Sequence, residues 1–223
     1  MNETGERFRG TYGYLVGDSE TPNRLLLVRH GEVEMAGRLY GQMDVALSER
    51  GREQSRALVE RLRPHRIDAV YSSDLERARW AAGLIAEDRG LTVQVRPGLR
   101  ERFFGAWQGK TWEEIRATSP EPFERYMRDF TSIVPPGDGE TYDKVRARVL
   151  PIVREMVGQG DGRQVVAIVH AGVIRVILAE ALGMPLQNLF HIYIDPGGVS
   201  VIEYHPNGRQ VVRLVNGTSD FRF

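Results

Sequence analysis

Cysteine is absent from the 223 residues of the chain. Without thiols the chain has no disulfide framework, no thiolate metal site and no cysteine nucleophile. No apolar run approaches the roughly 18 residues that a membrane-spanning helix needs, and the polar residues 1–6 lack the layout of a secretory signal. We therefore expect a soluble, cytoplasmic protein without a membrane partner.

Net charge is also absent, because 30 Lys plus Arg balance 30 Asp plus Glu. Proteins that bind nucleic acid usually concentrate basic charge on one face, so this balance argues against a nucleic-acid partner. Lysine is scarce, since Lys110 and Lys144 are the only lysines among the 30 basic residues. A cationic site in this chain must therefore consist mainly of guanidinium groups, which bind phosphate or carboxylate with a planar fork.

Strand-like and helix-like segments alternate along the chain. Strand-like segments lie at 25–28, 68–71, 91–95 and 165–169, and the continuous apolar run at 25–28 is typical of a strand buried on both faces. Segments with helical spacing of apolar residues lie at about 48–62, 72–88 and 173–182. Ser48 is a suitable N-cap, and Gly90 and Gly183 are suitable helix terminators. The pattern predicts an α/β fold, a three-layer sandwich with a mostly parallel central sheet and helices on both faces.

One stretch interrupts this alternation. Between about 106 and 140 the chain carries several aromatic residues and then the breaker Pro135-Pro136-Gly137. We interpret this stretch as a helical insertion within a single domain that spans residues 1–223. Strands are expected within 191–215, around a turn at 205–208, and they could provide an edge for a homodimer. Residues 12–16 could form a further edge strand or lie along the surface.

Two histidines directly follow predicted strands, and a glycine comes soon after each. Arg29-His30-Gly31 follows the first apolar run, and His170-Ala171-Gly172 follows the run at 165–169. Ligands of open α/β sheets bind at the carboxyl ends of strands, so both imidazoles are expected in one crevice. A single strand-end histidine is more often a hydrogen-bonded structural residue, and the hypothesis of a functional site therefore depends on the pair.

Five segments in order along the chain carry recognisable motifs. They are 27–32 with Arg29-His30-Gly31, 41–51 with Gly41-Gln42, 71–78 with Ser72-Ser73-Asp74 and Arg77, 99–109 with Glu101, and 169–175 with His170. Together they resemble the histidine phosphatase (phosphoglycerate mutase-like) superfamily. This resemblance implies the α/β fold of that superfamily and phosphoryl transfer through a histidine.

The resemblance also implies the role of each catalytic residue. His30 would attack phosphorus as a neutral imidazole whose other ring nitrogen is held by a backbone carbonyl. Arg29 and Arg77 would neutralise the phosphoryl group, while His170 would donate a hydrogen bond to its equatorial oxygens. Glu101 would protonate the leaving oxygen and then activate water. The expected substrate-binding residues are Arg29, Arg77, His170, Gly31, Gln42 and Gly172.

The residues alone leave other interpretations open. Arg77 could form a surface ion pair with Asp74 or Glu76, and Glu101 lies in a charged run of a kind that is usually solvated. Glu140 follows a Pro-Gly segment similar to one in the family, and it is either an N-terminal helix residue or a substrate-side residue. The aromatic residues of the insertion could shape a pocket for the leaving group, although such clusters more often form a small core.

We predict a histidine acid-type phosphatase, a phosphomonoesterase that acts on small phosphate esters without a metal or cofactor. Residues 31–35 lack the Trp-Asn pair that is typical of mutases, and residues 37–42 resemble the α-ribazole phosphatase branch. A phosphoglycerate mutase is the alternative function. A catalytically silent binding or regulatory module on the same fold is a second alternative.

Overall fold

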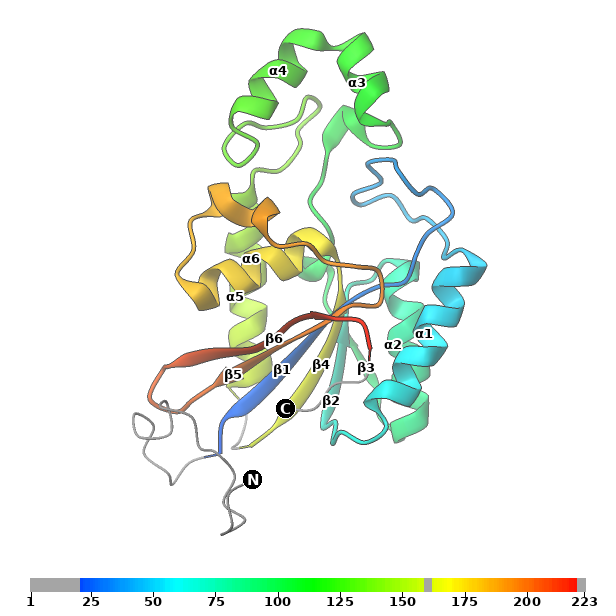
Figure 1. The fold of residues 1–223 in the computed structure, drawn as a ribbon, viewed down its shortest axis with the longest axis vertical. Helices are drawn as coiled ribbons and strands as arrows, with labels where there is room; N and C mark the ends of the chain where they lie inside the picture. The colour runs from blue at the N-terminus through cyan, green and yellow to red at the C-terminus, as the bar shows by residue number, and fades with distance from the viewer. Residues whose placement is uncertain (1–20, 159–161, 220–223) are drawn as a thin grey trace, which may run out of the picture.

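A six-stranded mixed sheet forms the middle layer of the molecule (Figure 1). The computed structural model describes residues 21–158 and 162–219, so the segment 12–16 lies outside the described residues. The sheet has the strand order β3-β2-β4-β1-β5-β6. The strands are β1 (Asn23–Arg29), β2 (Ala69–Ser72), β3 (Val93–Val95), β4 (Gln164–Val169), β5 (Val199–Tyr204) and β6 (Gln210–Gly217). Strands β1 to β4 run parallel, whereas β5 and β6 are antiparallel, which confirms a mostly parallel sheet.

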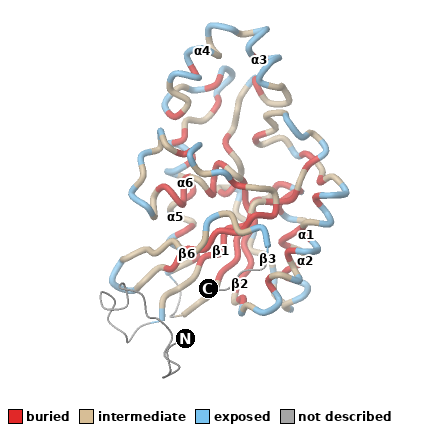
Figure 2. The backbone as a smooth tube through the Cα atoms, viewed as in Figure 1, coloured by how far each residue is buried: buried red, intermediate tan, exposed pale blue. Residues whose placement is uncertain are grey.

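Helices cover both faces of this sheet. One helical layer consists of α1 (Glu49–Leu62) and α2 (Glu76–Arg89), and the other consists of α5 (Tyr142–Val157) and α6 (Ala171–Leu182). Successive residues of β1 point to opposite faces, so Leu26 packs with the α1–α2 layer and Leu27 packs with the α5–α6 layer. The buried residues accordingly gather along the central strands (Figure 2). This arrangement confirms the expected three-layer α/β sandwich.

Local signals in the sequence define the helix ends. The Ser48 hydroxyl accepts a hydrogen bond from the Gly51 backbone N–H, 3.1 Å away, and thereby caps α1. Gly90 and Gly183 end α2 and α6 in the left-handed conformation, with φ of 62° and 61°. The predicted cap and both predicted terminators are confirmed. None of the helices in the described part of the chain combines the length and apolarity that crossing a bilayer requires.

The insertion extends away from the carboxyl ends of the parallel strands (Figure 1). Its helices are α3 (Trp112–Thr118) and α4 (Pro120–Arg128), preceded by the short turn η3 (Gly105–Trp107). Trp107, Ile115 and Tyr126 form its buried core, in which the Trp107 and Tyr126 rings meet edge to face at 5.1 Å. These three residues form a small core, as such clusters usually do.

Arg102 joins this insertion to the sandwich. Its side chain is fully buried, and all its hydrogen-bond partners lie between 126 and 140 in the chain. The guanidinium donates to the carbonyls of Glu140 (2.6 Å), Phe130 (2.8 Å) and Ile133 (3.1 Å) and to the Tyr126 hydroxyl (2.9 Å). One cation therefore holds the end of α4 and the segment that follows it.

Candidate active site

The ends of β1 and β4 bring the two histidines together. These strands are parallel neighbours in which Arg29 pairs with Val169, so His30 and His170 are the next residues on each strand. Their ring centroids are 5.1 Å apart with an angle of 60° between the ring planes. Both side chains are buried, His30 with 2% and His170 with 0% of its surface exposed. The structure thus places both imidazoles in one enclosed position at the carboxyl edge of the sheet.

Among the described residues, His30 has a hydrogen-bond partner for one ring nitrogen and none for the other. Its Nδ1 lies 2.7 Å from the backbone carbonyl oxygen of Gly31. Because a carbonyl can only accept, Nδ1 carries the proton and Nε2 carries the lone pair. Burial lowers the pKa of His30 well below 6.5, and the positive charges of Arg77 and Arg29 lower it further. A neutral imidazole with a free Nε2 lone pair is the form that can act as a nucleophile.

His170 has the complementary arrangement. Its Nε2 lies 2.8 Å from the Ser73 hydroxyl, while its buried Nδ1 has no hydrogen-bond partner among the described residues. Burial lowers the pKa of His170 well below 6.5, and Arg77 and His30 lower it further, so the ring is neutral. When Ser73 donates to Nε2, the single ring proton lies on Nδ1, which is then free to donate to a ligand.

Arg77 is buried in the same place. It donates from Nη1 to the Met43 carbonyl (2.6 Å) and from Nη2 to the Gly41 carbonyl (2.5 Å), while its Nε is buried without a partner. Its guanidinium carbon lies 4.8 Å from the centre of the Tyr40 ring. Within the described residues Arg77 contacts no carboxylate, because Asp74 binds Arg100 instead, at 2.7 Å. The surface ion pair considered for Arg77 is therefore wrong.

Arg29 is held by a segment from the far end of the chain. Its Nη1 donates to the carbonyl of Ile194 at 2.6 Å, and its buried Nε has no partner in the described part of the chain. Within the described residues, Nε of each of these two guanidinium groups and Nδ1 of His170 are therefore buried without a hydrogen-bond partner. A group with several acceptor oxygens, such as a phosphoryl group, would satisfy all three donors.

Glu101 is bound at both its carboxylate and its backbone. One carboxylate oxygen accepts from the backbone N–H of Arg102 (2.8 Å) and the other from that of Gly172 (2.9 Å). Its own carbonyl accepts from Gln42 Nε2 and from Arg148 Nη2, each at 3.0 Å. Because its neighbour Arg102 is fully buried and Glu101 itself is half-buried, the charged run at 100–102 is not simply a solvated surface.

The expected substrate-binding residues Gly31, Gln42 and Gly172 all lie at this site, in close contacts with protein atoms. A Cβ on Gly31 would overlap the backbone of Gly51, and a Cβ on Gly172 would overlap the Glu101 carboxylate. The Gln42 side-chain amide nitrogen binds the Glu101 carbonyl (3.0 Å) and a Glu140 carboxylate oxygen (3.3 Å). In this geometry the two glycines allow close packing, and Gln42 links two loops.

Glu140 is paired with Arg148, at 2.8 and 2.9 Å from its two carboxylate oxygens. Burial by itself raises the pKa of Glu140, but hydrogen bonds from Arg148 and from the Phe103 backbone N–H outweigh it, and the net shift is downward. Helix α5 begins at Tyr142, so Glu140 precedes the helix and the expectation of an N-terminal helix residue is corrected. Its carboxylate is occupied by protein partners and supports the loop that carries Glu101.

Four residues of the site had no role in the sequence interpretation: Tyr40, Ser73, Arg148 and Arg175. Tyr40, Ser73 and Arg175 lie inside the quoted motifs, at 37–42, 71–78 and 169–175, but nothing in the local sequence shows which residues they contact. Arg148 lies outside these motifs and binds the carbonyls of Gly98, Arg100 and Glu101 across a long sequence separation. Only a pattern that relates distant segments could have identified it.

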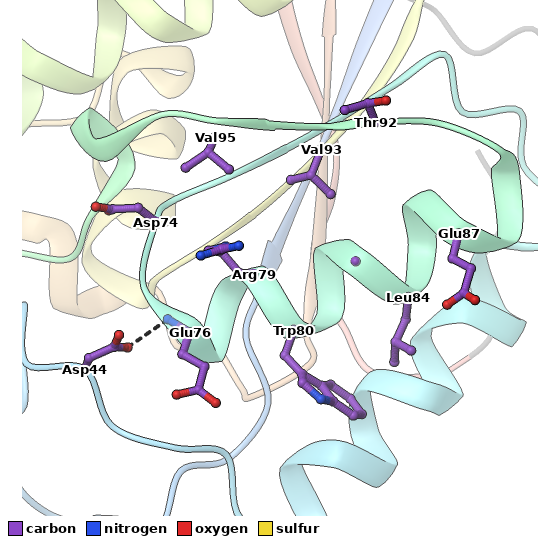
Figure 3. A pocket seen from close by; sticks show the side chains of 11 residues that line it. Asp44, Asp74, Glu76, Arg79, Trp80, Leu84, Glu87, Thr92, Val93 and Val95 are labelled. Atoms are coloured by element: carbon purple, nitrogen blue, oxygen red, sulfur yellow. Dashed lines mark hydrogen bonds between the residues drawn. The ribbon is translucent and has the colours of Figure 1, made fainter.

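A separate hollow lies between α2 and β3 (Figure 3). Its volume is about 690 Å³. Among the described residues that line it are four carboxylates, those of Asp44, Asp74, Glu76 and Glu87, against a single guanidinium, that of Arg79. An acidic lining repels phosphate, so this hollow is a poor site for a phosphate ester. Within the described residues no group of three or more His, Asp or Glu side chains could hold a metal ion.

Comparison with known proteins identifies the class. The sequence profile of the histidine phosphatase superfamily (branch 1) matches residues 25–217. The chain belongs to the histidine phosphatase superfamily, which confirms the resemblance inferred from the five motifs.

Individual relatives agree with this class. The chain is 32% identical over 201 residues to the adenosylcobalamin/alpha-ribazole phosphatase of Salmonella typhimurium, covering 89% of this chain and 98% of that one. It is 37% identical over 205 residues to a bifunctional protein of Mycobacterium tuberculosis, of whose length it spans 56%. The crystal structure of the alpha-ribazole phosphatase from Shigella flexneri superposes with a TM-score of 0.81 at 30% identity, covering 90% of this chain and 99% of that one.

Proposed function

We propose that this protein hydrolyses small phosphate monoesters through a covalent phosphohistidine on His30. The observation that carries the proposal is the free Nε2 lone pair of a buried, neutral His30, whose Nδ1 is held by the Gly31 carbonyl. Membership of the histidine phosphatase superfamily and the phosphatases among its relatives support this function.

In the first half of the reaction, His30 Nε2 attacks phosphorus and forms a P–N bond. The bond between phosphorus and the leaving oxygen breaks, and Glu101 gives its proton to that oxygen. The unpartnered N–H groups of Arg29, Arg77 and His170 bind the phosphoryl oxygens as charge spreads over them. Since these donors are already oriented by protein contacts, little reorganisation is needed when the transition state forms.

In the second half, water attacks the phosphohistidine. Glu101 takes a proton from the water, the P–N bond breaks, and its electron pair returns to Nε2 of His30. Inorganic phosphate leaves, and both His30 and Glu101 are back in their starting protonation states. The cycle uses side chains of this chain, water and a small phosphate ester as its single partner. Cytoplasmic location and a homodimer through the edge strand β6 stay predictions.

The acid-type character of this activity is part of the proposal. Burial and two neighbouring guanidinium groups lower the pKa of His30, so the nucleophile stays neutral at a pH where an exposed imidazole would be protonated. His170 shares this property. Both observations support turnover that continues into the mildly acidic range.

Trapping the intermediate tests the proposed function. Rapid quenching in alkali after mixing with a ³²P-labelled ester should give an acid-labile label on the wild-type protein, together with free inorganic phosphate. The His30→Ala variant should lose both label and turnover, because it has no nucleophile. As a matched control, His65→Ala should keep both, since His65 lies before β2, at the opposite end of the sheet from His30.

The same experiment separates the alternatives. A label that persists in His30→Ala would overturn the assignment of the nucleophile. Absence of any label and of turnover would favour the silent binding module. Transfer of most of the label to added phosphoglycerate, with little free phosphate, would favour the mutase.

A further inference from the structure

Arg175 lies on the accessible side of α6, beside the proposed proton donor. The helix begins directly after His170, and within its first nine residues Gly172 to Ile174 and Val176 to Ala179 are buried. Ala171 and Arg175 are half-buried, and because they are four residues apart they share one face of the helix. Since the Gly172 N–H binds the Glu101 carboxylate, this end of α6 lies against Glu101.

Arg175 and Arg29 are anchored on the same short segment. Arg175 donates from Nε to the carbonyl of Ile192 (2.8 Å), and Arg29 donates from Nη1 to the carbonyl of Ile194 (2.6 Å). Burial lowers the pKa of Arg175 most, Tyr142 and Glu101 oppose this shift, and Arg29 adds to it. The charges of Arg29 and Glu101 are near enough to change the pKa of Arg175, so Arg175 belongs to the electrostatic environment of the site.

The terminal nitrogens of Arg175 are unused. Within the described residues, Nη1 and Nη2 have no hydrogen-bond partner, and the guanidinium carbon lies 4.9 Å from the centre of the Phe190 ring. Phe190 is 51% exposed, and its ring is fixed from behind by Phe130, at 4.7 Å between centroids. A guanidinium fork supported on an aromatic wall is a suitable site for a planar anion.

A count of charge indicates that this anion is singly charged. A phosphoryl group carries about two negative charges near neutrality, and Arg29 and Arg77 offset both. His30 and His170 are neutral, and Glu101 is uncharged when it holds the proton that it delivers. Arg102 is also a cation, but its guanidinium binds three carbonyls and the Tyr126 hydroxyl. Within the described residues Arg175 instead has free Nη groups, which one further negative charge on the substrate would engage.

We propose that Arg175 binds a carboxylate on the leaving group, so that the preferred substrates are phosphate monoesters of hydroxy acids. The leaving oxygen must lie at Glu101 to receive its proton, and Arg175 lies on the helix face next to Glu101. Its two free Nη groups match the two oxygens of a carboxylate. This inference rests on the proposed phosphatase function and adds the class of leaving group.

Matched substrates test the proposal. Phosphoglycolate carries a carboxylate, phosphoglycolamide replaces it with a neutral amide of nearly the same shape, and ethylene glycol bisphosphate replaces it with a second phosphate. For the wild-type protein we expect kcat/KM for phosphoglycolate to exceed that for phosphoglycolamide by roughly 10- to 100-fold, which is the usual value of a charge-assisted hydrogen-bonded pair. Arg175→Met keeps an apolar stem against Phe190 and should bring this ratio close to one.

Control variants keep the test independent of folding. Arg66→Met removes an exposed arginine before β2 and should leave the ratio unchanged. If Arg175→Met does not fold, Arg175→Lys is measured in its place. Lysine has a single nitrogen, which cannot bind both the Ile192 carbonyl and the carboxylate in a fork, so the ratio should fall at least about fivefold.

Three outcomes would overturn the inference. Equal kcat/KM for phosphoglycolate and phosphoglycolamide in the wild type would show that no carboxylate is recognised. An equal loss on both esters in Arg175→Met would assign Arg175 a structural role only. A higher kcat/KM for the bisphosphate than for phosphoglycolate would show that the site recognises a doubly charged phosphate group and not a carboxylate. Failure to hydrolyse any of the three esters would instead contradict the proposed function, so the two failures are distinguishable.

Discussion

Glu101 shows how a single residue of this site is positioned. Two backbone N–H groups bind its carboxylate, and two side chains bind its carbonyl. The carboxyl group therefore has a fixed direction before any substrate arrives. A fixed direction matters for a proton donor because proton transfer requires the donor within hydrogen-bonding distance of the leaving oxygen.

Glu101→Gln should slow the hydrolysis of alkyl phosphates by roughly 10²–10⁴-fold, the usual contribution of general acid catalysis. Glutamine keeps the size of the side chain but has no transferable proton. Hydrolysis of p-nitrophenyl phosphate should suffer less, because nitrophenolate leaves without being protonated. The measurement is kcat/KM for both esters in both proteins. Equal losses on the two esters, with phosphorylation shown to limit the rate, would contradict the role of Glu101.

Gly172→Ala should displace the same carboxylate without unfolding the protein. The added methyl group would overlap the Glu101 carboxylate, which lies at the end of a flexible side chain and can move away. A displacement of about 1 Å can lower the rate by roughly 100-fold, so we expect a loss of up to that size on alkyl phosphates. The measurement is kcat/KM together with the thermal midpoint of unfolding.

Gly83→Ala is the control for this substitution. Gly83 lies inside α2, and an added methyl group there meets nothing within 4 Å. This variant should keep its activity and gain roughly 0.5–1 kcal/mol of stability, because alanine is the better helix former. Wild-type activity in Gly172→Ala would show that the close approach to Glu101 has no part in the reaction.

At the scale of elements, the sequence predicted every strand of the described sheet but not every helix. Helices α1, α2 and α6 carry apolar stripes with a cap or a terminating glycine, and these local signals agree with the structure. Helix α5 also has an apolar stripe, formed by Val145, Val149, Val153 and Met156. Pro151 interrupts that stripe in the sequence, and a proline within a run is normally evidence against a helix. In the folded protein, the stabilisation gained by packing this apolar stripe on the sheet is larger than the cost of placing a proline inside the helix.

Pro151→Ala should therefore stabilise the protein. Pro151 lacks the N–H that would bind a carbonyl one turn earlier in α5, and proline inside a helix is unfavourable by about 3 kcal/mol relative to alanine. We expect a gain in the free energy of unfolding of roughly 1–3 kcal/mol, because a helix can adjust locally around a proline. Urea unfolding of the two proteins measures it. A loss of stability would show that the proline ring packs in a way that alanine cannot replace.

The candidate site was also predictable only in part, because many of its contacts join segments that are far apart in the sequence. The motifs identify Arg29, His30 and His170 because each lies at the end of a buried strand, and strand ends can be predicted from local sequence. The partners of these residues come from elsewhere. Ser73 follows a different strand, and the carbonyls that hold Arg29 and Arg175 lie near the end of the chain. Such contacts depend on the three-dimensional arrangement and leave no signal in the neighbouring sequence.

At the scale of the whole molecule, burying two neutral histidines links folding to pH. The folded protein holds the pKa of His30 and of His170 well below 6.5, whereas the unfolded chain has imidazoles near 6.5. Below pH 6.5 the unfolded state therefore binds more protons than the folded state. The contribution of the two neutral histidines to the free energy of unfolding is therefore fully present above pH 6.5, and it is lost as the pH falls below that value.

We expect the free energy of unfolding to fall between pH 6.5 and pH 5 by as much as about 1.4 kcal/mol per pH unit for each histidine. This window lies above the range in which the stabilised carboxylates, such as Glu140 and Asp74, become protonated. Urea unfolding at several pH values measures the slope. The double variant His30→Ala, His170→Ala should show a flatter dependence, and an unchanged slope would contradict the assignment to these two residues.

The anchoring of the insertion by Arg102 has a consequence for protein design. Three of the four acceptors that hold this buried cation are backbone carbonyls, which any residue can supply. The arginine itself directly follows Glu101 and belongs to the motif segment 99–109. A foreign loop grafted between 104 and 139 would need to present carbonyls to that guanidinium, whatever its own side chains are. The fold thereby anchors the insertion to the catalytic sandwich largely through main-chain atoms, which constrain the path of the loop more than its side chains.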